Sequence, residues 1–167
     1  MTPDTTTKAT IELSVIVPAH NEERVIDRCA ASLRGQTHAD LQLIFVLDRC
    51  TDRTRDLLEQ HAAADDRITI IENDHCPDDW AGKCNAARIG AEHATGDMFL
   101  FMDADTEADP GVVRAAVALA RKRKLGLLSL LSTLSCEQGF ERTSQPVATM
   151  ALLSLYPPDM VNRVEKS

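Results

Sequence analysis

The chain has 167 residues, of which 44% are hydrophobic and 26% charged, with only 7 glycines and 7 prolines. This is the length of one domain, with enough apolar side chains to bury a core, which excludes a disordered or fibrous chain. The formal net charge of −8 argues against a nucleic-acid partner, and we interpret the one basic run, at 121–124, as the solvated end of a helix.

Short β-branched runs alternate with segments of helical period from residue 11 onward, which predicts a parallel sheet covered by helices. The first strand should end at Pro18, because proline cannot donate to a sheet ladder. The last strand is apolar throughout, which is typical of a central strand buried on both faces. The strands are expected over 13–17, 41–47, 68–71 and 98–102.

Helical segments separate the predicted strands. The first is expected to begin with Asn21 as its cap and Glu22 and Glu23 in its first turn, and to end at Gly35. The apolar positions inside it recur at helical spacing, which places one face on the sheet. Further helices are expected over 54–63 and 80–94.

The pattern continues beyond the last predicted strand. Asp109 provides a cap and Pro110 the first helical position of a fourth helix. Residues 125–134 fit either a strand or a buried helix. A helix with a break at Pro146 is expected over 137–155.

The five cysteines form no C-x-x-C pair, and the amino terminus lacks the apolar stretch of a secretory signal. A zinc site built from His75, Cys76 and Cys84 would lack the paired ligand spacing that a structural site requires. No apolar run approaches the roughly 20 residues that span a bilayer. We therefore expect a cytoplasmic protein, either free or at the inner face of the membrane.

Polar clusters follow three of the predicted strands, at 18–22, 48–52 and 103–105. In an open α/β sheet the ligand binds outside the carboxyl ends of the strands, so these clusters should converge on one site. The chain has neither the G-x-G-x-x-G motif of dinucleotide-binding folds nor a P-loop. Both of these common nucleotide sites are therefore excluded.

Asp103 and Asp105 lie where the apolar strand emerges from the sheet, so that both carboxylates can reach one hard cation. On a regular strand the two side chains would be roughly 7 Å apart on one face, so the turn must bring them closer. Their oxygens suit Mg²⁺ or Mn²⁺. The alternative is a strand-end turn in which both side chains cap backbone amides.

Four stretches carry a resemblance to a known family: VIVPAHNEE, VLDRCTDRT, GKCNA and ATGDMFLFMDADT, at 15–23, 46–54, 82–86 and 94–106. In order and spacing they resemble the motifs of the inverting family 2 glycosyltransferases. The resemblance covers about residues 11 to 163, and it implies the Rossmann-like GT-A fold, a mostly parallel α/β sheet flanked by helices, with a nucleotide-diphosphate sugar as donor. The stretches 129–142, 155–157 and 161–162 further resemble the hopanoid-associated branch of the family.

The resemblance also implies roles for single residues. Pro18, Ala19 and Glu22 would line the nucleoside pocket. Asp48 would accept a hydrogen bond from the base, and Lys83 would lie near the nucleotide.

The D-x-D pair would have the central role in this site. The resemblance implies that Asp103 and Asp105 hold the ribose, the diphosphate and a Mg²⁺ or Mn²⁺ ion. The chain departs from the family at the end of the second strand, where paired acids are common but Leu47 precedes Asp48. This removes a supporting carboxylate and puts a preference for uracil in doubt.

An inverting displacement needs a general base on the acceptor side. The family supplies it from an acidic motif downstream of D-x-D, and that motif contains none of Glu137, Glu141, Asp159 and Glu165. We therefore expect the base to lie beyond Ser167 and the sheet to be incomplete at its carboxyl end. The expected organisation is a disordered tail, a nucleotide-sugar-binding domain and the helical start of a truncated acceptor region, at 1–10, 11–134 and 135–167.

By this resemblance, the leading function is metal-dependent transfer of a sugar from a nucleotide-diphosphate sugar, with inversion, to an acceptor such as a lipid or polyisoprenoid. One alternative is a nucleotide-binding module without turnover. Another is a sugar-nucleotide pyrophosphorylase, which predicts a glycine-rich basic loop where this chain has PAHNEE. A sheet that lacks its last strands exposes an edge, so self-association is also expected.

Overall fold

The computed structural model describes residues 12–130, 132, 146, 150, 154 and 155. Residues up to 128 form one compact unit and those from 129 on form a second. The tail predicted over 1–10, the hopanoid-like residues 156–162 and most of 129–155 lie outside the described residues; 146, 150, 154 and 155 are helical. Over the described part of the chain, no helix is both long and apolar enough to cross a membrane.

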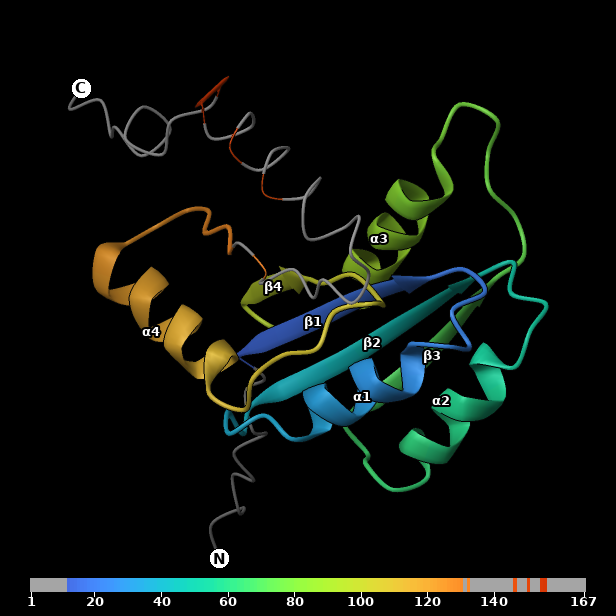
Figure 1. Ribbon diagram of the computed structural model, residues 1–167, viewed down its shortest axis with the longest axis horizontal. Helices are drawn as coiled ribbons and strands as arrows, with labels where there is room; N and C mark the ends of the chain where they lie inside the picture. The colour runs from blue at the N-terminus through green and yellow to red at the C-terminus, as the bar shows by residue number, and fades with distance from the viewer. Residues whose placement is uncertain (1–11, 131, 133–145, 147–149, 151–153, 156–167) are drawn as a thin grey trace, which may run out of the picture. The chain divides into compact units, whose positions relative to one another are not determined.

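A parallel four-stranded sheet forms the centre of the first unit (Figure 1). Its order is β3-β2-β1-β4, and every neighbouring pair is parallel. The strands are β1 Leu13–Ala19, β2 Leu41–Asp48, β3 Ile68–Asn73 and β4 Met98–Phe101. The helices are α1 Ile26–Arg34, α2 Thr54–Ala62, α3 Gly82–His93 and α4 Val112–Arg123. This confirms the predicted α/β class with a mostly parallel sheet.

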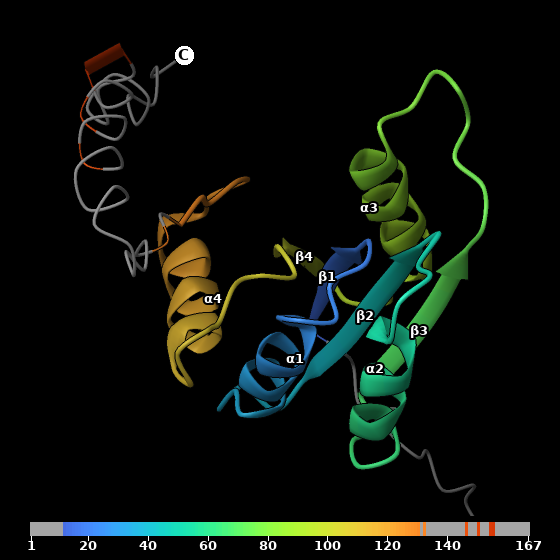
Figure 2. The same cartoon turned by 45° about the vertical axis from the view of Figure 1, so that its right-hand side comes forward.

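Alternating side chains of the two central strands build a separate apolar layer on each face of the sheet. On one face, Val15 and Phe45 pack with Leu33 of α1 and Leu58 of α2. On the other face, a smaller cluster joins the sheet to α3 through Ile16, Ile44, Val46 and Ala86. Figure 2 shows α1 and α2 on one side of the sheet and α3 on the other. The strands β1 and β2 are therefore buried on both faces.

The order of the strands determines where a ligand can bind. From β1 the chain adds β2 and then β3 on one side, and it then returns to place β4 on the other side of β1. The strand order therefore reverses between β1 and β4, and in an open α/β sheet the crevice that binds a ligand lies at the carboxyl ends of the strands at such a point. Two of the three polar clusters, 18–22 and 103–105, lie at this crevice.

The predicted start of the first helix is wrong. The helix α1 begins at Ile26, and Asn21 has a left-handed backbone with a φ of 55°. The Asn21 side chain does not cap α1 but accepts a hydrogen bond at 2.8 Å from the backbone N–H of Thr51, in the loop after β2. Asparagine adopts this conformation more readily than most residues, and the contact with a distant loop stabilises it.

The predicted cap of the fourth helix also differs from the structure. Asp109 and Pro110 lie in the turn before α4, whose N-cap is Gly111. The carbonyl of Pro110 instead accepts a hydrogen bond at 2.9 Å from the backbone N–H of Thr37, so this turn is bound to the loop after α1. The basic run ends α4 as predicted, and Lys124 has the left-handed conformation of a C-cap.

The strand β4 is at the edge of the described sheet, which corrects the prediction of a strand buried on both faces. Met98 and Leu100 pack against the larger apolar cluster, whereas Phe99 and Phe101 are 49% and 55% exposed. The phenylalanines lie on the face that α3 covers, but α3 packs mainly on β1 and β2. Residues 125–130 form neither of the elements expected there, and Leu127 is exposed.

An ionic contact before β3 predicts a pH-dependent stability. Asp65 accepts hydrogen bonds from Arg67 at 2.9 Å and 2.7 Å, and Arg67 also donates to the carbonyl of Arg34 at the end of α1. The Arg67 guanidinium lowers the pKa of Asp65 in the folded protein. The contact therefore stabilises the fold above the unfolded-state pKa of about 3.9, and this stability is lost as the pH falls through the lower folded-state value.

Asp65→Asn is expected to lower the free energy of unfolding by about 1 kcal/mol at pH 7, because hydrogen bonds to a charged acceptor are lost. The deficit should shrink as the pH falls below about 4, because Asp65 of the unfolded wild type then binds a proton before Asp65 of the folded protein does. Urea denaturation at pH 7 and pH 3 measures both values. Asp66→Asn, an exposed neighbour, is the control and should change stability by less than about 0.5 kcal/mol. A deficit that is equal at both pH values would contradict the assignment.

Candidate functional site

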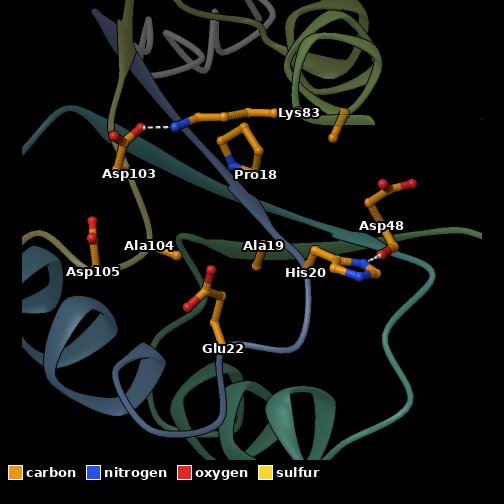
Figure 3. A pocket seen from close by; sticks show the side chains of 10 residues that line it. Pro18, Ala19, His20, Glu22, Asp48, Lys83, Asp103, Ala104 and Asp105 are labelled. Carbon is orange, nitrogen blue, oxygen red and sulfur yellow. Dashed lines mark hydrogen bonds and ion pairs between the residues drawn. The ribbon is translucent and has the colours of Figure 1, made fainter. Parts of the chain in front are cut away.

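A pocket lies at the carboxyl ends of β1, β2 and β4 (Figure 3). All seven residues that the sequence singles out line it, although they come from four separate segments of the chain. In the view of Figure 3, Asp48 lies at one end of the pocket, and Asp103 and Asp105 lie at the other. The complete lining is Pro18, Ala19, His20, Glu22, Asp48, Lys83, Ala86, Asp103, Ala104 and Asp105.

Asp48 is the last residue of β2, and it is only 4% exposed. Its Oδ1 accepts hydrogen bonds from Arg49 Nε at 3.2 Å and from Asn73 Nδ2 at 2.8 Å, while Oδ2 accepts one from Arg49 Nη2 at 2.8 Å. The hydrogen bond from Arg49 is the main reason that the pKa of Asp48 lies below its usual range. Asp48 is therefore a buried, ionised acceptor with most of its acceptor positions already occupied.

Lys83 and Asp103 form an ion pair across the pocket. Lys83, in the first turn of α3, places Nζ 2.6 Å from Oδ1 of Asp103, which follows β4. More than half of each side chain is exposed. An ion pair this exposed contributes little to stability, so both groups are available to a charged ligand.

Asp103 and Asp105 both face the pocket from the segment after β4, with Glu22 from the β1–α1 loop in the same lining. In the described part of the chain, no group of three or more potential ligands is close enough to hold a metal by itself. Mg²⁺ and Mn²⁺ accept this arrangement, because such ions are commonly held by one or two carboxylates, with waters and substrate phosphates as further ligands. The residues present therefore fit a divalent cation that enters together with a diphosphate.

The position of Glu22 depends on contacts between two loops. Thr54 Oγ1 accepts a hydrogen bond from the backbone N–H of Glu22 at 2.9 Å. Asp52 accepts hydrogen bonds from Thr54 N, from Thr54 Oγ1 and from the backbone N–H of Glu23. Burial alone would raise the pKa of Asp52, but these hydrogen bonds bring it below its usual range. Asp52 thus contacts the start of α2 and also joins the β1–α1 loop to it.

Cys29, in α1, lies near the end of the pocket that contains Asp103. Its Sγ is 4.0 Å from the carbonyl oxygen of Asp103. Burial, followed by the charges of Asp105 and Glu107, raises the pKa of Cys29 to about 12. The thiol is therefore protonated at neutral pH and packs as an apolar group rather than acting as a nucleophile.

Sequence reasoning missed several residues of this site. His20 lies in the PAHNEE stretch but received no role; its Nδ1 is 2.5 Å from the carbonyl oxygen of Asp48, so Nδ1 carries the proton in this contact. Asn73 has no sequence signal, and it reaches Asp48 because the β2–β3 register pairs these two residues. A Cβ at Gly82 would clash with the Asp48–Arg49 pair, and only the folded structure shows this close approach.

Comparison with protein families identifies the family to which this chain belongs. The family model described as Glycosyl transferase family 2 matches residues 14–147. The chain belongs to glycosyl transferase family 2. The membership in family 2 that the sequence motifs implied is thereby confirmed.

Curated relatives of this family 2 chain are glycosyltransferases. An uncharacterised glycosyltransferase of Haemophilus influenzae is 36% identical over 110 residues, which are 66% of this chain and 33% of that protein. A 4,4'-diaponeurosporenoate glycosyltransferase of Staphylococcus haemolyticus is 31% identical over 125 residues, which are 74% of this chain and 32% of that protein. The chain thus spans about a third of the length of these relatives.

Solved structures show the same fold. TarS of S. aureus, in complex with UDP-GlcNAc, aligns with a TM-score of 0.61 and 20% identity, covering 72% of this chain and 37% of that one. The mannosyltransferase PcManGT of Pyrobaculum calidifontis, in complex with GDP-Man and Mn²⁺, aligns with a TM-score of 0.58 and 24% identity, covering 78% of this chain and 37% of that one. The predicted GT-A fold is therefore confirmed.

Proposed function

We propose that this domain is the donor site of a family 2 glycosyltransferase and binds a nucleotide-diphosphate sugar for transfer with inversion at the anomeric carbon. The observation that carries the proposal is the convergence of Glu22, Asp48, Lys83, Asp103 and Asp105 on one pocket at the switch point of the sheet. The pocket has a buried acceptor at one end and exposed carboxylates with a lysine at the other. This order matches the base and the diphosphate of one nucleotide.

Each part of the nucleotide has a group in the pocket that suits its chemistry. Asp48 accepts a hydrogen bond from the base, while Pro18 and Ala19 line the nucleoside. Lys83 can exchange Asp103 for a phosphate oxygen, because its ion pair is exposed. Asp103 and Asp105 would hold Mg²⁺ or Mn²⁺, whose chemistry when bound is to offset the charge that grows on the leaving diphosphate.

The acceptor, and the general base that deprotonates it, complete the proposal. We infer a lipid or polyisoprenoid acceptor, supported by the relative named 4,4'-diaponeurosporenoate glycosyltransferase. In this scheme Asp48 binds the nucleobase, and Asp103 and Asp105 hold the metal. The general base that takes the proton of the acceptor is therefore assigned to residues downstream of the D-x-D segment, as the family pattern implies.

Self-association through β4 is part of the same proposal. This strand is at the edge of the described sheet, and its Phe99 and Phe101 are about half exposed. An exposed, apolar edge strand can pair with another copy of itself. In analytical ultracentrifugation, the wild type should form a concentration-dependent dimer, and Phe99→Glu should remain a monomer.

Calorimetry with UDP and GDP, each with and without Mn²⁺, tests the donor site. We expect at least one nucleoside diphosphate to bind, and to bind about tenfold or more tightly with Mn²⁺, because the ion reduces repulsion between the pocket carboxylates and the phosphates. A second assay follows labelled UDP-sugars and GDP-sugars with membrane lipid extract, separating sugar transfer from release of free sugar. If no nucleoside diphosphate binds under any of these conditions, the proposed function is wrong. Binding without turnover would support the nucleotide-binding module instead.

A further inference from the structure

We propose that Arg49 is a specificity-determining residue that leaves Asp48 a single free acceptor position, so that the site takes a uracil-type base in preference to guanine. This inference rests on the proposed function and deepens it. The solved relatives include complexes with UDP-GlcNAc and with GDP-Man, so the fold is compatible with both bases. The choice must therefore come from side chains of this chain.

Counting hydrogen bonds at Asp48 gives the first step. Each carboxylate oxygen has two acceptor positions. On Oδ1 both are occupied, by Arg49 Nε and Asn73 Nδ2, and on Oδ2 Arg49 Nη2 occupies one. Asp48 can therefore accept one further hydrogen bond, on Oδ2. The Arg49 side chain is 48% exposed, so it presents unused N–H donors beside that position.

The edges of the bases give the second step. Uracil has one N–H donor between two carbonyl acceptors, which matches one free acceptor with guanidinium donors next to it. Guanine has two adjacent donors, N1–H and the N2 amino group, and a carboxylate satisfies both only when each oxygen has a free position. With Oδ1 occupied, one guanine donor would be buried without a partner, which costs about 1–3 kcal/mol.

The backbone conformation of Arg49 is an unfavourable one that the Asp48–Arg49 contact requires. Arg49 has a φ of 51°, a left-handed conformation that an arginine rarely adopts. Its backbone N–H donates to the carbonyl of Asn73 at 2.8 Å, which holds the residue in this conformation. Gly82 leaves room for the pair, since a Cβ there would lie 2.6 Å from Asp48 Oδ2 and 2.8 Å from Arg49 Nη2. Arg49, Asn73 and Gly82, from three separate segments of the chain, thus all accommodate the Asp48–Arg49 contact.

The test is calorimetry of UDP, GDP and pyrophosphate, with Mn²⁺ present, on the wild type and Arg49→Gly. Glycine removes the guanidinium and also accepts the left-handed backbone, so this variant should fold. We expect the wild type to bind UDP about tenfold more tightly than GDP. The ratio should fall about tenfold in Arg49→Gly, because one acceptor on each oxygen becomes free, whereas pyrophosphate should bind equally to both proteins.

Two further variants sharpen the result. Asn73→Ala frees one position on Oδ1 and leaves Arg49 in place, so it should shift the ratio in the same direction by a smaller factor. Arg53→Ala is the matched control, since this arginine lies in the same loop, is exposed and pairs with Glu23 instead of Asp48. A wild type that prefers GDP, or an unchanged ratio in Arg49→Gly, would overturn the inference while the donor site stands. Only failure of the wild type to bind any nucleotide would remove the proposed function as well.

Discussion

Replacing Asp105 with asparagine is expected to reduce by 10- to 100-fold the gain in nucleotide affinity that Mn²⁺ provides. Asp105 lies in the pocket wall after β4 and has no ion-pair partner among the described side chains. Its replacement would therefore remove one proposed metal ligand without freeing a lysine. Asp103→Asn would remove the partner of Lys83 at the same time, so its effect mixes two causes. Calorimetric titration of UDP and GDP with and without Mn²⁺ measures the gain directly.

Asp97→Asn is the matched control for this experiment. It makes the same change in net charge. Asp97 is exposed and directly precedes β4, so it lies at the amino-terminal end of the strand, whereas the pocket lies at the carboxyl ends. We expect this variant to keep the full effect of Mn²⁺. If Asp105→Asn keeps it too, Asp105 does not contribute to metal binding, and its assignment as a ligand would be wrong.

Gly90→Ala is expected to destabilise the fold by about 1–3 kcal/mol, although alanine is the better helix former by about 1 kcal/mol. Gly90 lies inside α3, where the helix is packed closely on the sheet. A Cβ there would be 2.4 Å from Ile16 Cγ2 and 3.2 Å from Val46 Cγ2, both on buried side chains of the central strands. Because neither side chain has free space to move into, the helix must shift away from the sheet. Urea denaturation measures the change in the free energy of unfolding.

Two controls separate the steric cause from other effects of the substitution. A Cβ on Gly126 meets nothing within 4 Å, so Gly126→Ala should not destabilise the fold. Ile16→Ala removes the methyl group that the new Cβ would meet, and alone it should cost about 2–5 kcal/mol. The double variant Gly90→Ala with Ile16→Ala should then cost less than the two single changes added together. Strict additivity would show that the contact with Ile16 is not the cause.

Periodicity along the chain was sufficient to predict the strands and helices, because a residue's preference for the inside of the sheet is expressed in local spacing. The runs at 41–47 and 68–71 lie within β2 and β3, and α3 lies within the segment 80–94. The ends of elements were less predictable. Pro18 belongs to β1 and pairs with Val46, and Asn21 lies in a loop rather than at the N-cap of α1. Such boundaries depend on contacts with segments about thirty residues away.

The sequence by itself determined which groups the pocket contains. The PAHNEE stretch, Asp48, Lys83 and the D-x-D pair can be identified from their residue types and their order along the chain. Only the tertiary structure decided how those groups are used. The β2–β3 register brings Asn73 to Asp48, and the left-handed backbone of Arg49 turns its guanidinium back onto the same carboxylate. Likewise, β4 has the apolar sequence of a central strand but lies at the edge of the described sheet. Burial and free acceptor positions are properties of neighbours in space, and local spacing does not encode them.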